Sequence, residues 1–307
     1  MSTRALPSCP CFLNSFDMNS VTEKAYAKIN ISLDVTARRP DGYHDMVMVM
    51  QTVSLCDDIE ITLVENAPSS AECNLHFVPS DERNLAVRAA NAFLAKAGIE
   101  NTGAHIKMHK RIPVGAGMAG GSSDAAAVLR GLNRLCGQPF DKAALLALAE
   151  EIGSDVPFCV EGGTALAKGR GEILSPLPPL PDCDIVICKP EFSTSTPELF
   201  KKLDAIKLKC HPDTNGIISA LESGDLTKLS RRMYNVFEDV PDRKLGTISA
   251  IKSTMLDCGA LGSIMTGTGS AVFGIFPDEK SAENACEELK KEYRLCYLAK
   301  NQPKINV

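Results

Sequence analysis

An unbroken alternation of apolar and polar residues predicts a β-strand over residues 25–35. Its apolar side chains share one face, and these are Ala25, Ala27, Ile29, Ile31, Leu33 and Val35. The polar side chains share the other face, and these are Tyr26, Lys28, Asn30, Ser32 and Asp34. Because successive side chains of a strand point to opposite sides, the pattern predicts a half-buried strand with a polar working surface.

Patterns of period 2 and period 3.6 divide the rest of the first half into strands and helices. Strands are expected over residues 46–55, 59–64 and 105–112, and helices over residues 84–98, 125–135 and 142–152. Gly153 ends the last of these helices, so residues 154–157 are expected in a loop. Residues 39–44, Arg-Pro-Asp-Gly-Tyr-His, are typical of a turn, because proline fixes φ and Asp-Gly suits a tight turn.

Proline and serine are concentrated over residues 174–181, where we expect a domain boundary. The division places one domain over residues 21–173 and a second over residues 174–307, after a disordered leader at 1–20 with Met18 as an alternative start. In the second domain the patterns predict strands and helices in an α+β arrangement. The strands are 184–188, 271–276 and 295–298, and the helices are 214–236, 245–258 and 281–293.

Charge and composition exclude several classes of partner. The chain has 33 basic and 38 acidic residues and a net charge of −5, so it lacks the overall positive field that holds nucleic acid or an anionic membrane. No apolar run is long enough for a membrane span. The 12 cysteines show no Cys-x-x-Cys spacing and are expected to be reduced, and no protein metal site is predicted. Cys9 and Cys11 alone cannot complete a zinc shell.

A glycine-rich loop over residues 113–124, Pro-Val-Gly-Ala-Gly-Met-Ala-Gly-Gly-Ser-Ser-Asp, leads from a predicted strand into a predicted helix. Glycines allow backbone N–H groups to converge on a phosphate at a helix N-terminus. The loop is no Walker A motif, because the chain has no Gly-Lys-Ser/Thr. Gly115, Gly117 and Gly120 fit a dinucleotide fingerprint, but Asp141 follows a helix rather than the required strand. The loop therefore predicts phosphate binding of another kind.

The glycine-rich loop changes the interpretation of two charged residues, Lys28 and Asp155. Taken alone, Lys28 fits a solvated lysine and Asp155 fits a capping or turn aspartate. Phosphoryl transfer to an alcohol needs an anion cradle, a carboxylate that accepts the hydroxyl proton, and a cation that stabilises the developing charge. The loop, Asp155 and Lys28 supply these three parts. Tyr43 and His44 fit either a surface turn or a ligand-stacking pair.

Three segments together resemble the GHMP kinase superfamily, which includes galactokinase, homoserine kinase, mevalonate kinase and phosphomevalonate kinase. Residues 113–127 resemble its phosphate-binding motif, residues 25–33 its first motif and residues 265–276 its third. The resemblance implies a two-domain α+β GHMP kinase fold with the active site in the cleft between the lobes. Residues 39–44, with Ala-Lys-Ile-Asn at 27–30, resemble the members that act on the cytidyl diphosphate of methylerythritol.

This resemblance implies a role for each matching residue. Asp155 matches the catalytic base and Lys28 the catalytic lysine, while Asn30 matches an asparagine that contacts substrate. Tyr43 and His44 match the cytidine site, with Phe200 on the opposite face of the base and Thr196 and Pro197 beside it. Asn84, Leu85 and Lys110 match positions near adenine. The triphosphate cradle is implied to comprise Pro113, Gly115, Gly117, Gly120, Gly121, Ser122 and Ser123.

The implied reaction transfers the γ-phosphate of ATP, bound as Mg-ATP, to the 2-hydroxyl of the methylerythritol group in non-mevalonate isoprenoid biosynthesis. Two alternatives stay open: a GHMP-type kinase acting on another alcohol such as homoserine or a mevalonate relative, and a non-catalytic ATP-binding member. The expected partner is a small-molecule substrate, without nucleic acid or membrane. A cytoplasmic monomer or weak homodimer is expected.

Overall fold

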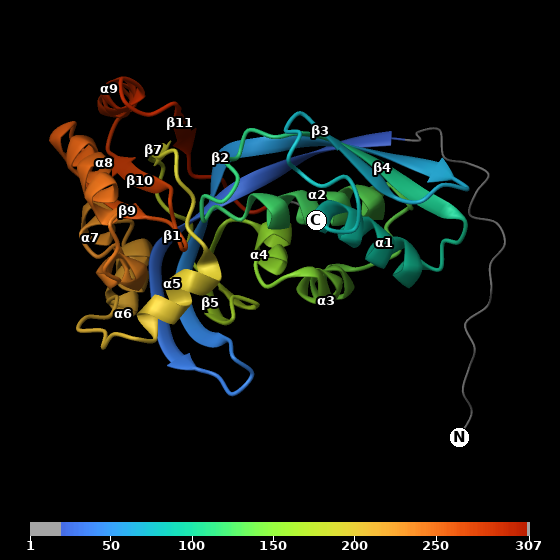
Figure 1. The fold of residues 1–307 in the computed structure, drawn as a ribbon, viewed down its shortest axis with the longest axis horizontal. Coiled ribbons are helices and arrows are strands. Elements are labelled where there is room, and N and C mark those ends of the chain that lie inside the picture. The colour runs from blue at the N-terminus through green and yellow to red at the C-terminus, as the bar shows by residue number, and fades with distance from the viewer. Residues whose placement is uncertain (1–19, 306–307) are drawn as a thin grey trace.

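The structure, a computed structural model, describes residues 20–305, which form two lobes built around two β-sheets (Figure 1). The leader expected at residues 1–20, with Cys9, Cys11 and Met18, lies outside the described residues except for Ser20. That residue already belongs to the first strand.

The larger sheet has seven strands in the order β3-β4-β2-β1-β8, with β5 and β6 attached through β2. Its centre is a long antiparallel pair of strands that runs the length of the lobe (Figure 1). β3 pairs in parallel with β4, and the remaining pairs among β1 to β6 are antiparallel. The strands are β1 (Ser20–Arg38), β2 (His44–Glu65), β3 (Ser70–Cys73), β4 (Thr102–His109), β5 (Thr164–Gly169) and β6 (Ile173–Pro176).

Four helices lie along one face of this sheet (Figure 1). They are α1 (Leu85–Ala97), α2 (Gly120–Leu135), α3 (Lys142–Ile152) and α4 (Val156–Glu161). Local sequence explains where α1 begins and ends: the Asn84 side chain accepts a hydrogen bond from Ala86 N, and Gly98 takes the left-handed conformation that closes the helix. The sequence-based prediction for this helix is confirmed.

The smaller sheet is antiparallel, with strand order β11-β7-β10-β9. Helices α8 and α9 pack on one of its faces, and α5, α6 and α7 complete the lobe (Figure 1). Its strands are β7 (Asp184–Lys189), β9 (Gly262–Met265), β10 (Val272–Phe276) and β11 (Leu295–Lys300). The helices are α5 (Thr196–Leu203), α6 (Thr214–Glu222), α7 (Leu226–Ser230), α8 (Leu245–Asp257) and α9 (Glu279–Lys290).

The two lobes share strands and a hydrophobic core. β8 (Tyr234–Asn235) comes from the second half of the chain but pairs in parallel with β1, and a 3-10 helix, η1 (Val236–Asp239), follows it. Ile29 and Ile31 of β1 pack in one buried cluster with Ile187 of β7 and Phe273 of β10. The lobes are therefore held together by apolar packing, which fixes the relative positions of the groups between them.

β1 differs from the predicted half-buried strand, because both of its faces are buried. The predicted polar face holds Lys28, Asn30 and Ser32, with exposed fractions of 4%, 0% and 0%. Bulges interrupt its pairing with β2 at Tyr26/Lys28 and Asn30/Ser32. A bulge shifts the side-chain alternation, so Ala25 and the pair Leu33 and Val35 enter one core while the intervening apolar residues enter the other.

Other predicted boundaries also need correction. The runs 46–55 and 59–64 form one strand, β2, because Asp57 is held inside the sheet by buried hydrogen-bond donors. Residues 154–157 are no plain loop, since α4 begins at Val156. The helix expected over residues 214–236 is broken at Gly224, which has φ +66. The boundary placed before residue 174 falls inside β6, which still pairs with β5. We therefore propose a boundary over residues 177–183, between β6 and β7.

Candidate active site

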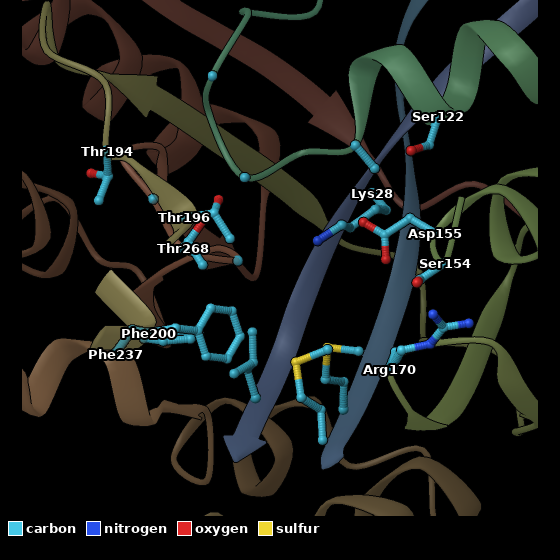
Figure 2. A pocket seen from close by; sticks show the side chains of 18 residues that line it. Lys28, Ser122, Ser154, Asp155, Arg170, Thr194, Thr196, Phe200, Phe237 and Thr268 are labelled. Carbon is cyan, nitrogen blue, oxygen red and sulfur yellow. The ribbon is translucent and has the colours of Figure 1, made fainter. Parts of the chain in front are cut away.

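A cavity of about 360 Å³ lies between the two lobes and receives side chains from both. Figure 2 shows Ser122, Asp155, Ser154 and Arg170 on one side, Phe200 and the threonines opposite, and Lys28 between them. The lining residues are Lys28, Leu33, Met46, Met48, Gly115, Gly117, Ala119, Ser122, Ser154, Asp155, Arg170, Thr194, Thr196, Phe200, Phe237, Gly267, Thr268 and Gly269.

Lys28 is the buried cation of the cavity. The bulge after Tyr26 turns its side chain away from the core that receives Ile29 and Ile31 and towards the cavity. Its Nζ donates a hydrogen bond of 2.6 Å to Asn30 Oδ1. A buried ammonium needs such partners, because leaving it without hydrogen bonds is costly.

Asn30 does not line the cavity, although the resemblance implies a substrate contact. Its Oδ1 accepts from Lys28 Nζ and, at 3.1 Å, from Gly267 N. Its backbone N donates to Thr266 Oγ1 at 3.0 Å, and its Nδ2 lies 3.4 Å from Met48 Sδ. Both ends of the amide are therefore engaged within the protein. Asn30 connects Lys28 to the second glycine turn, at residues 266–271 between β9 and β10.

Asp155 is placed by the start of α4. It occupies the N-cap position, yet its side chain makes no capping hydrogen bond. None of the hydrogen bonds or ion pairs within residues 20–305 uses its carboxylate, which points into the same cavity as Lys28 (Figure 2). Behind it, burial first and then the charge of Asp155 raise the pKa of the Cys159 thiol to about 12. That thiol therefore stays protonated, whereas the Asp155 carboxylate is open to the cavity.

The glycine loop packs against the turn between β9 and β10. A Cβ on Gly117, which has φ +75, would lie 2.3 Å from Thr266 O. A Cβ on Gly267 would likewise lie 2.7 Å from Gly117 O. Glycine is therefore required here for close contact between two backbone turns as well as for the left-handed conformation.

Only part of the glycine loop lines the cavity. α2 begins at Gly120, so Gly120 to Ser123 form its first turn rather than a loop before the helix. Gly115, Gly117 and Ser122 line the cavity. Ser123 instead donates its hydroxyl to Tyr26 O. Pro113, Gly120, Gly121 and Ser123 are absent from the lining, and their place in a phosphate cradle stays a prediction.

The three residues expected near adenine lie outside this cavity. Asn84 caps α1, and its Nδ2 donates to Pro79 O at 2.8 Å. Leu85 is the first residue of α1 and lies beside Gly121. Lys110 is buried, and its Nζ donates to Asp57 Oδ2 at 2.6 Å and to Asp124 Oδ2 at 2.5 Å. These contacts give Asn84 and Lys110 structural partners, and an adenine role for the three residues stays a prediction.

The Asp57–Lys110–Asp124 triad connects β2 and β4 to the first turns of α2. Asp57 Oδ1 accepts from Arg111 N and, at 2.8 Å, from Ile112 N, which fixes the entrance of the glycine loop. Asp124 Oδ1 is buried without a hydrogen-bond partner among the described residues. Burial raises the pKa of Asp124 to about 7, although the charge of Lys110 opposes this shift. Burial lowers the pKa of Lys110, but the two carboxylates outweigh it, and the net shift is upward.

The raised pKa of Asp124 predicts a pH-dependent stability. The folded value of about 7 lies above the ordinary value of 3.8, so this contribution to stability is complete below about pH 4 and is lost as the pH rises through about 7. Relative to Asp124→Asn, the wild type should lose on the order of 2–3 kcal/mol of unfolding free energy between pH 5 and pH 8. Urea unfolding of both proteins at these pH values measures it. A constant difference between them contradicts the prediction.

The expected cytidine site is arranged differently from a simple two-ring clamp. His44 is buried, its ring stacks on Phe200 with centroids 4.5 Å apart, and its Nε2 lies 2.7 Å from Asp204 Oδ1. Phe200 also meets Phe237 edge to face at 5.0 Å. Tyr43 is 57% exposed and does not line the cavity. One face of Phe200 is therefore already covered by His44 rather than open towards Tyr43.

Of the two residues at the start of α5 that were expected beside the base, only one lines the cavity. Thr196 lines the cavity, and its hydroxyl lies 2.9 Å from Thr268 Oγ1 in the second glycine turn. Pro197 occupies the first turn of α5 and is not part of the lining. The threonine pair joins α5 to the glycine turn on one wall of the cavity (Figure 2).

Sequence reasoning missed several residues of the site. Arg170, Ser154, Thr194 and Phe237 line the cavity without having been predicted. A signal for Arg170 is its place between two glycines, Gly169 and Gly171, which mark a tight turn. Ser154 is adjacent to Asp155, whereas Thr194 and Phe237 reach the cavity only through tertiary packing.

Asn235 and Glu238 hold the second glycine turn in place. Asn235 Nδ2 donates to the carbonyl oxygens of Met265 and Gly267, at 2.8 Å each. Glu238 Oε1 accepts from Met265 N at 2.7 Å. The segment that contains β8 and η1 therefore positions the backbone that packs against the glycine loop.

Within residues 20–305 there is no cluster of three or more His, Cys, Asp or Glu side chains that could hold a metal ion. None of the helices in this range is long and apolar enough to cross a membrane. All ten cysteines of the same range are free thiols.

Comparison with known proteins agrees with this arrangement. The family model for the GHMP kinases N terminal domain matches residues 84–163, and the model for the GHMP kinases C terminal domain matches residues 217–295. A crystal structure of a homoserine kinase from Cytophaga hutchinsonii has a TM-score of 0.74 at 19% identity, covering 95% of this chain and 97% of that one. The fold and the two glycine turns thus define a GHMP-type kinase.

Two further comparisons narrow the family. A protein from Clostridium perfringens (strain SM101) named 4-diphosphocytidyl-2-C-methyl-D-erythritol kinase is 45% identical over 88% of this chain and 94% of its own length. The crystal structure of a 4-(cytidine 5'-diphospho)-2C-methyl-D-erythritol kinase superposes with a TM-score of 0.75 at 32% identity, covering 92% of this chain and 99% of that one. The chain belongs to the 4-diphosphocytidyl-2-C-methyl-D-erythritol kinase family. It is therefore a kinase that uses ATP and a small-molecule acceptor.

Proposed function

We infer that this enzyme transfers the γ-phosphate of ATP to the 2-hydroxyl of 4-diphosphocytidyl-2-C-methyl-D-erythritol, in non-mevalonate isoprenoid biosynthesis. The products are the 2-phosphate and ADP. The observation that carries the proposal is the meeting of Lys28, Asp155 and the glycine loop in one cavity. Family membership alone would not show that these three groups lie together.

In the proposed reaction, Asp155 accepts the proton of the substrate hydroxyl as its oxygen forms a bond to the γ-phosphorus. The bond between that phosphorus and the bridging β–γ oxygen breaks, and ADP leaves with the electron pair. Lys28, oriented by its 2.6 Å hydrogen bond to Asn30, stabilises the negative charge that develops during transfer. Asn30 is proposed as a positioning residue, because its amide has both ends engaged inside the protein.

The phosphates of ATP are proposed to lie against Gly115, Gly117 and Ser122, at the N-terminus of α2. Unpaired N–H groups and the helix dipole favour an anion at this end. The Ser122 hydroxyl and the Asp155 carboxylate are hard oxygen donors, which suits the magnesium ion that accompanies ATP. That ion would neutralise phosphate charge, while the protein residues fix the acceptor and its proton.

The cytidine end is proposed to lie against the exposed face of Phe200, on the wall opposite Asp155 (Figure 2). His44 covers the other face of that ring, and its own position is fixed by Asp204. His44 therefore supports the aromatic platform, and the side chain of Phe237 supports it from the edge.

A coupled assay of ADP release tests the proposed function. It compares 4-diphosphocytidyl-2-C-methyl-D-erythritol with homoserine, mevalonate and galactose at equal concentrations of Mg-ATP. Turnover with the cytidyl substrate alone is expected. Turnover with a different alcohol alone would show another acceptor, and ATP binding without any turnover would show a non-catalytic member.

Removal of the Phe200 ring should weaken binding of the cytidyl substrate. Because stacking on a base contributes about 1–3 kcal/mol, Phe200→Ala should raise KM for this substrate by about 10- to 100-fold and leave KM for ATP within about twofold. Tyr43→Ala should have a smaller effect, since Tyr43 lies outside the cavity. Steady-state kinetics measures both values. An equal rise for the two substrates would mean that the ring supports the whole cleft instead of the base.

We also propose a cytoplasmic monomer or weak homodimer. Support comes from the free thiols of residues 20–305, which fit a reducing compartment. Both walls of the cavity come from one chain, so a second copy of the chain is not required to complete the cavity.

A further inference from the structure

Arg170 has no role in the mechanism described above, although it lines the cavity beside Asp155. We propose that Arg170 binds the diphosphate of the nucleoside-linked substrate and so makes the enzyme select nucleoside diphosphate-linked alcohols. The inference rests on the proposed function. It names the residue that binds the part of the substrate between the base and the reacting hydroxyl.

The turn that carries Arg170 is built next to the proposed base. Gly169 and Gly171 flank Arg170 with φ values of +69 and +121. A Cβ on Gly171 would lie 3.4 Å from Asp155 Oδ1 and 3.3 Å from Met48 Cε. The backbone of the turn therefore packs directly against Asp155, and Arg170 leaves the turn beside the place where the hydroxyl would react.

Among the described residues, the guanidinium group of Arg170 has one ion-pair partner, at the limit of contact. Its closest carboxylate is Glu172, whose Oε1 lies 4.0 Å from Arg170 Nε. Glu172 Oε2 instead accepts a hydrogen bond of 2.7 Å from the backbone N of Arg170. No hydrogen bond within residues 20–305 uses the guanidinium group, and its side chain is 34% exposed. Its N–H donors are available to a ligand.

One aromatic contact orients this group. The Cζ atom of Arg170 lies 5.2 Å from the centroid of the Tyr43 ring. Stacking restricts a guanidinium without using its edge, and the planar edge is what binds a phosphate through two parallel hydrogen bonds. Tyr43 thus restricts the position of the Arg170 guanidinium from outside the cavity.

The order of groups around the cavity gives the substrate a direction. Among the lining residues within 20–305, the cations are Lys28 and Arg170. In Figure 2 Lys28 lies near Asp155, whereas Arg170 lies farther along the same wall, beyond Ser154 and opposite Phe200. An acceptor whose hydroxyl meets Asp155 and whose base stacks on Phe200 would bring its diphosphate past Arg170.

Binding measurements separate this role from a general effect on the site. With the ATP site filled by a non-hydrolysable ATP analogue, calorimetry compares cytidine 5'-diphosphate with cytidine. We expect Arg170→Gln to weaken the binding of cytidine 5'-diphosphate by about 10- to 100-fold, because charge-assisted hydrogen bonds are lost. The binding of cytidine should weaken by less than about threefold. Arg170→Lys should recover part of the loss. Arg294→Gln, an exposed arginine outside the cavity, is the matched control and should bind as the wild type.

Kinetics on the same variants adds a second readout. Arg170→Gln should raise KM for the cytidyl substrate with KM for ATP unchanged. An equal loss of affinity for cytidine and for cytidine 5'-diphosphate overturns the proposal. A fall in kcat with an unchanged preference for the diphosphate also overturns it, because this result would place Arg170 at the transferring phosphate. Turnover by the wild type tests the proposed function separately. If the wild type turns over the cytidyl substrate and Arg170→Gln keeps the full preference for the diphosphate, only the role of Arg170 is overturned.

Discussion

Replacement of Asp155 by asparagine is expected to lower kcat by about 10²- to 10⁴-fold, with KM for ATP nearly unchanged. The change keeps the size of the side chain but removes the carboxylate that is proposed to accept the hydroxyl proton. Asp155 makes no capping hydrogen bond and no ion pair within residues 20–305, so the loss should appear in the rate rather than in stability. Steady-state ADP release and urea unfolding of the same preparation measure the two effects.

A matched control for this variant is Asp182→Asn, at an exposed aspartate between β6 and β7. It removes one carboxylate from the chain without touching the cavity and should keep wild-type kcat. If Asp155→Asn retained more than about a tenth of wild-type kcat, proton acceptance by Asp155 would be ruled out as a major contribution. The carboxylate would then serve mainly to hold the substrate, and KM for the acceptor should rise instead.

Gly117→Ala should impair both folding and ATP binding. Alanine at φ +75 is strained, and its Cβ would lie 2.3 Å from Thr266 O, which belongs to backbone and cannot rotate away. Strain and overlap together should lower the free energy of unfolding by more than about 3 kcal/mol. Where the variant still folds, KM for ATP should rise by at least about tenfold, because the two glycine turns must separate. Urea unfolding and steady-state kinetics test these effects.

Gly137→Ala separates strain from overlap. Gly137 has φ +74, almost the same as Gly117, but a Cβ there would meet nothing within 4 Å. This control should lose only about 1 kcal/mol of unfolding free energy and keep wild-type KM for ATP. Equal destabilisation of the two variants would show that contact between the glycine turns contributes nothing beyond the backbone conformation.

The sequence predicted the local elements well where a single face or a cap decides them. Asn84 and Gly98 delimit α1 through hydrogen bonds and a left-handed residue that involve only neighbouring positions. Helix α3 begins and ends where its pattern and Gly153 predict. The sequence failed at β2, where Asp57 looked like a break, because its hydrogen-bond donors come from residues more than 50 positions later.

The same distinction holds within the site. Lys28, Asp155 and the glycine loop were predicted from residue types that phosphoryl transfer needs, and Lys28, Asp155 and part of the loop line one cavity. Their supporting contacts could not be identified in this way. The resemblance placed Asn30 against the substrate, but in the structure Asn30 Oδ1 accepts a hydrogen bond from the backbone N of Gly267, 237 positions away. The sequence also paired Tyr43 with Phe200, whereas His44 covers Phe200.

By itself, the sequence determined the strand and helix pattern, the phosphate loop and the resemblance that names the family. Periodicity, caps and motif residues act over a few neighbouring positions, which is why they can be read along the chain. Only the tertiary structure decided which polar groups are engaged inside the protein and which are left for substrate. Bulges in β1 turn Lys28 into the cavity, and the packing of Gly171 on Asp155 brings Arg170 beside it. Such choices depend on contacts between distant segments, because a buried donor or acceptor must be satisfied by whatever the fold places next to it.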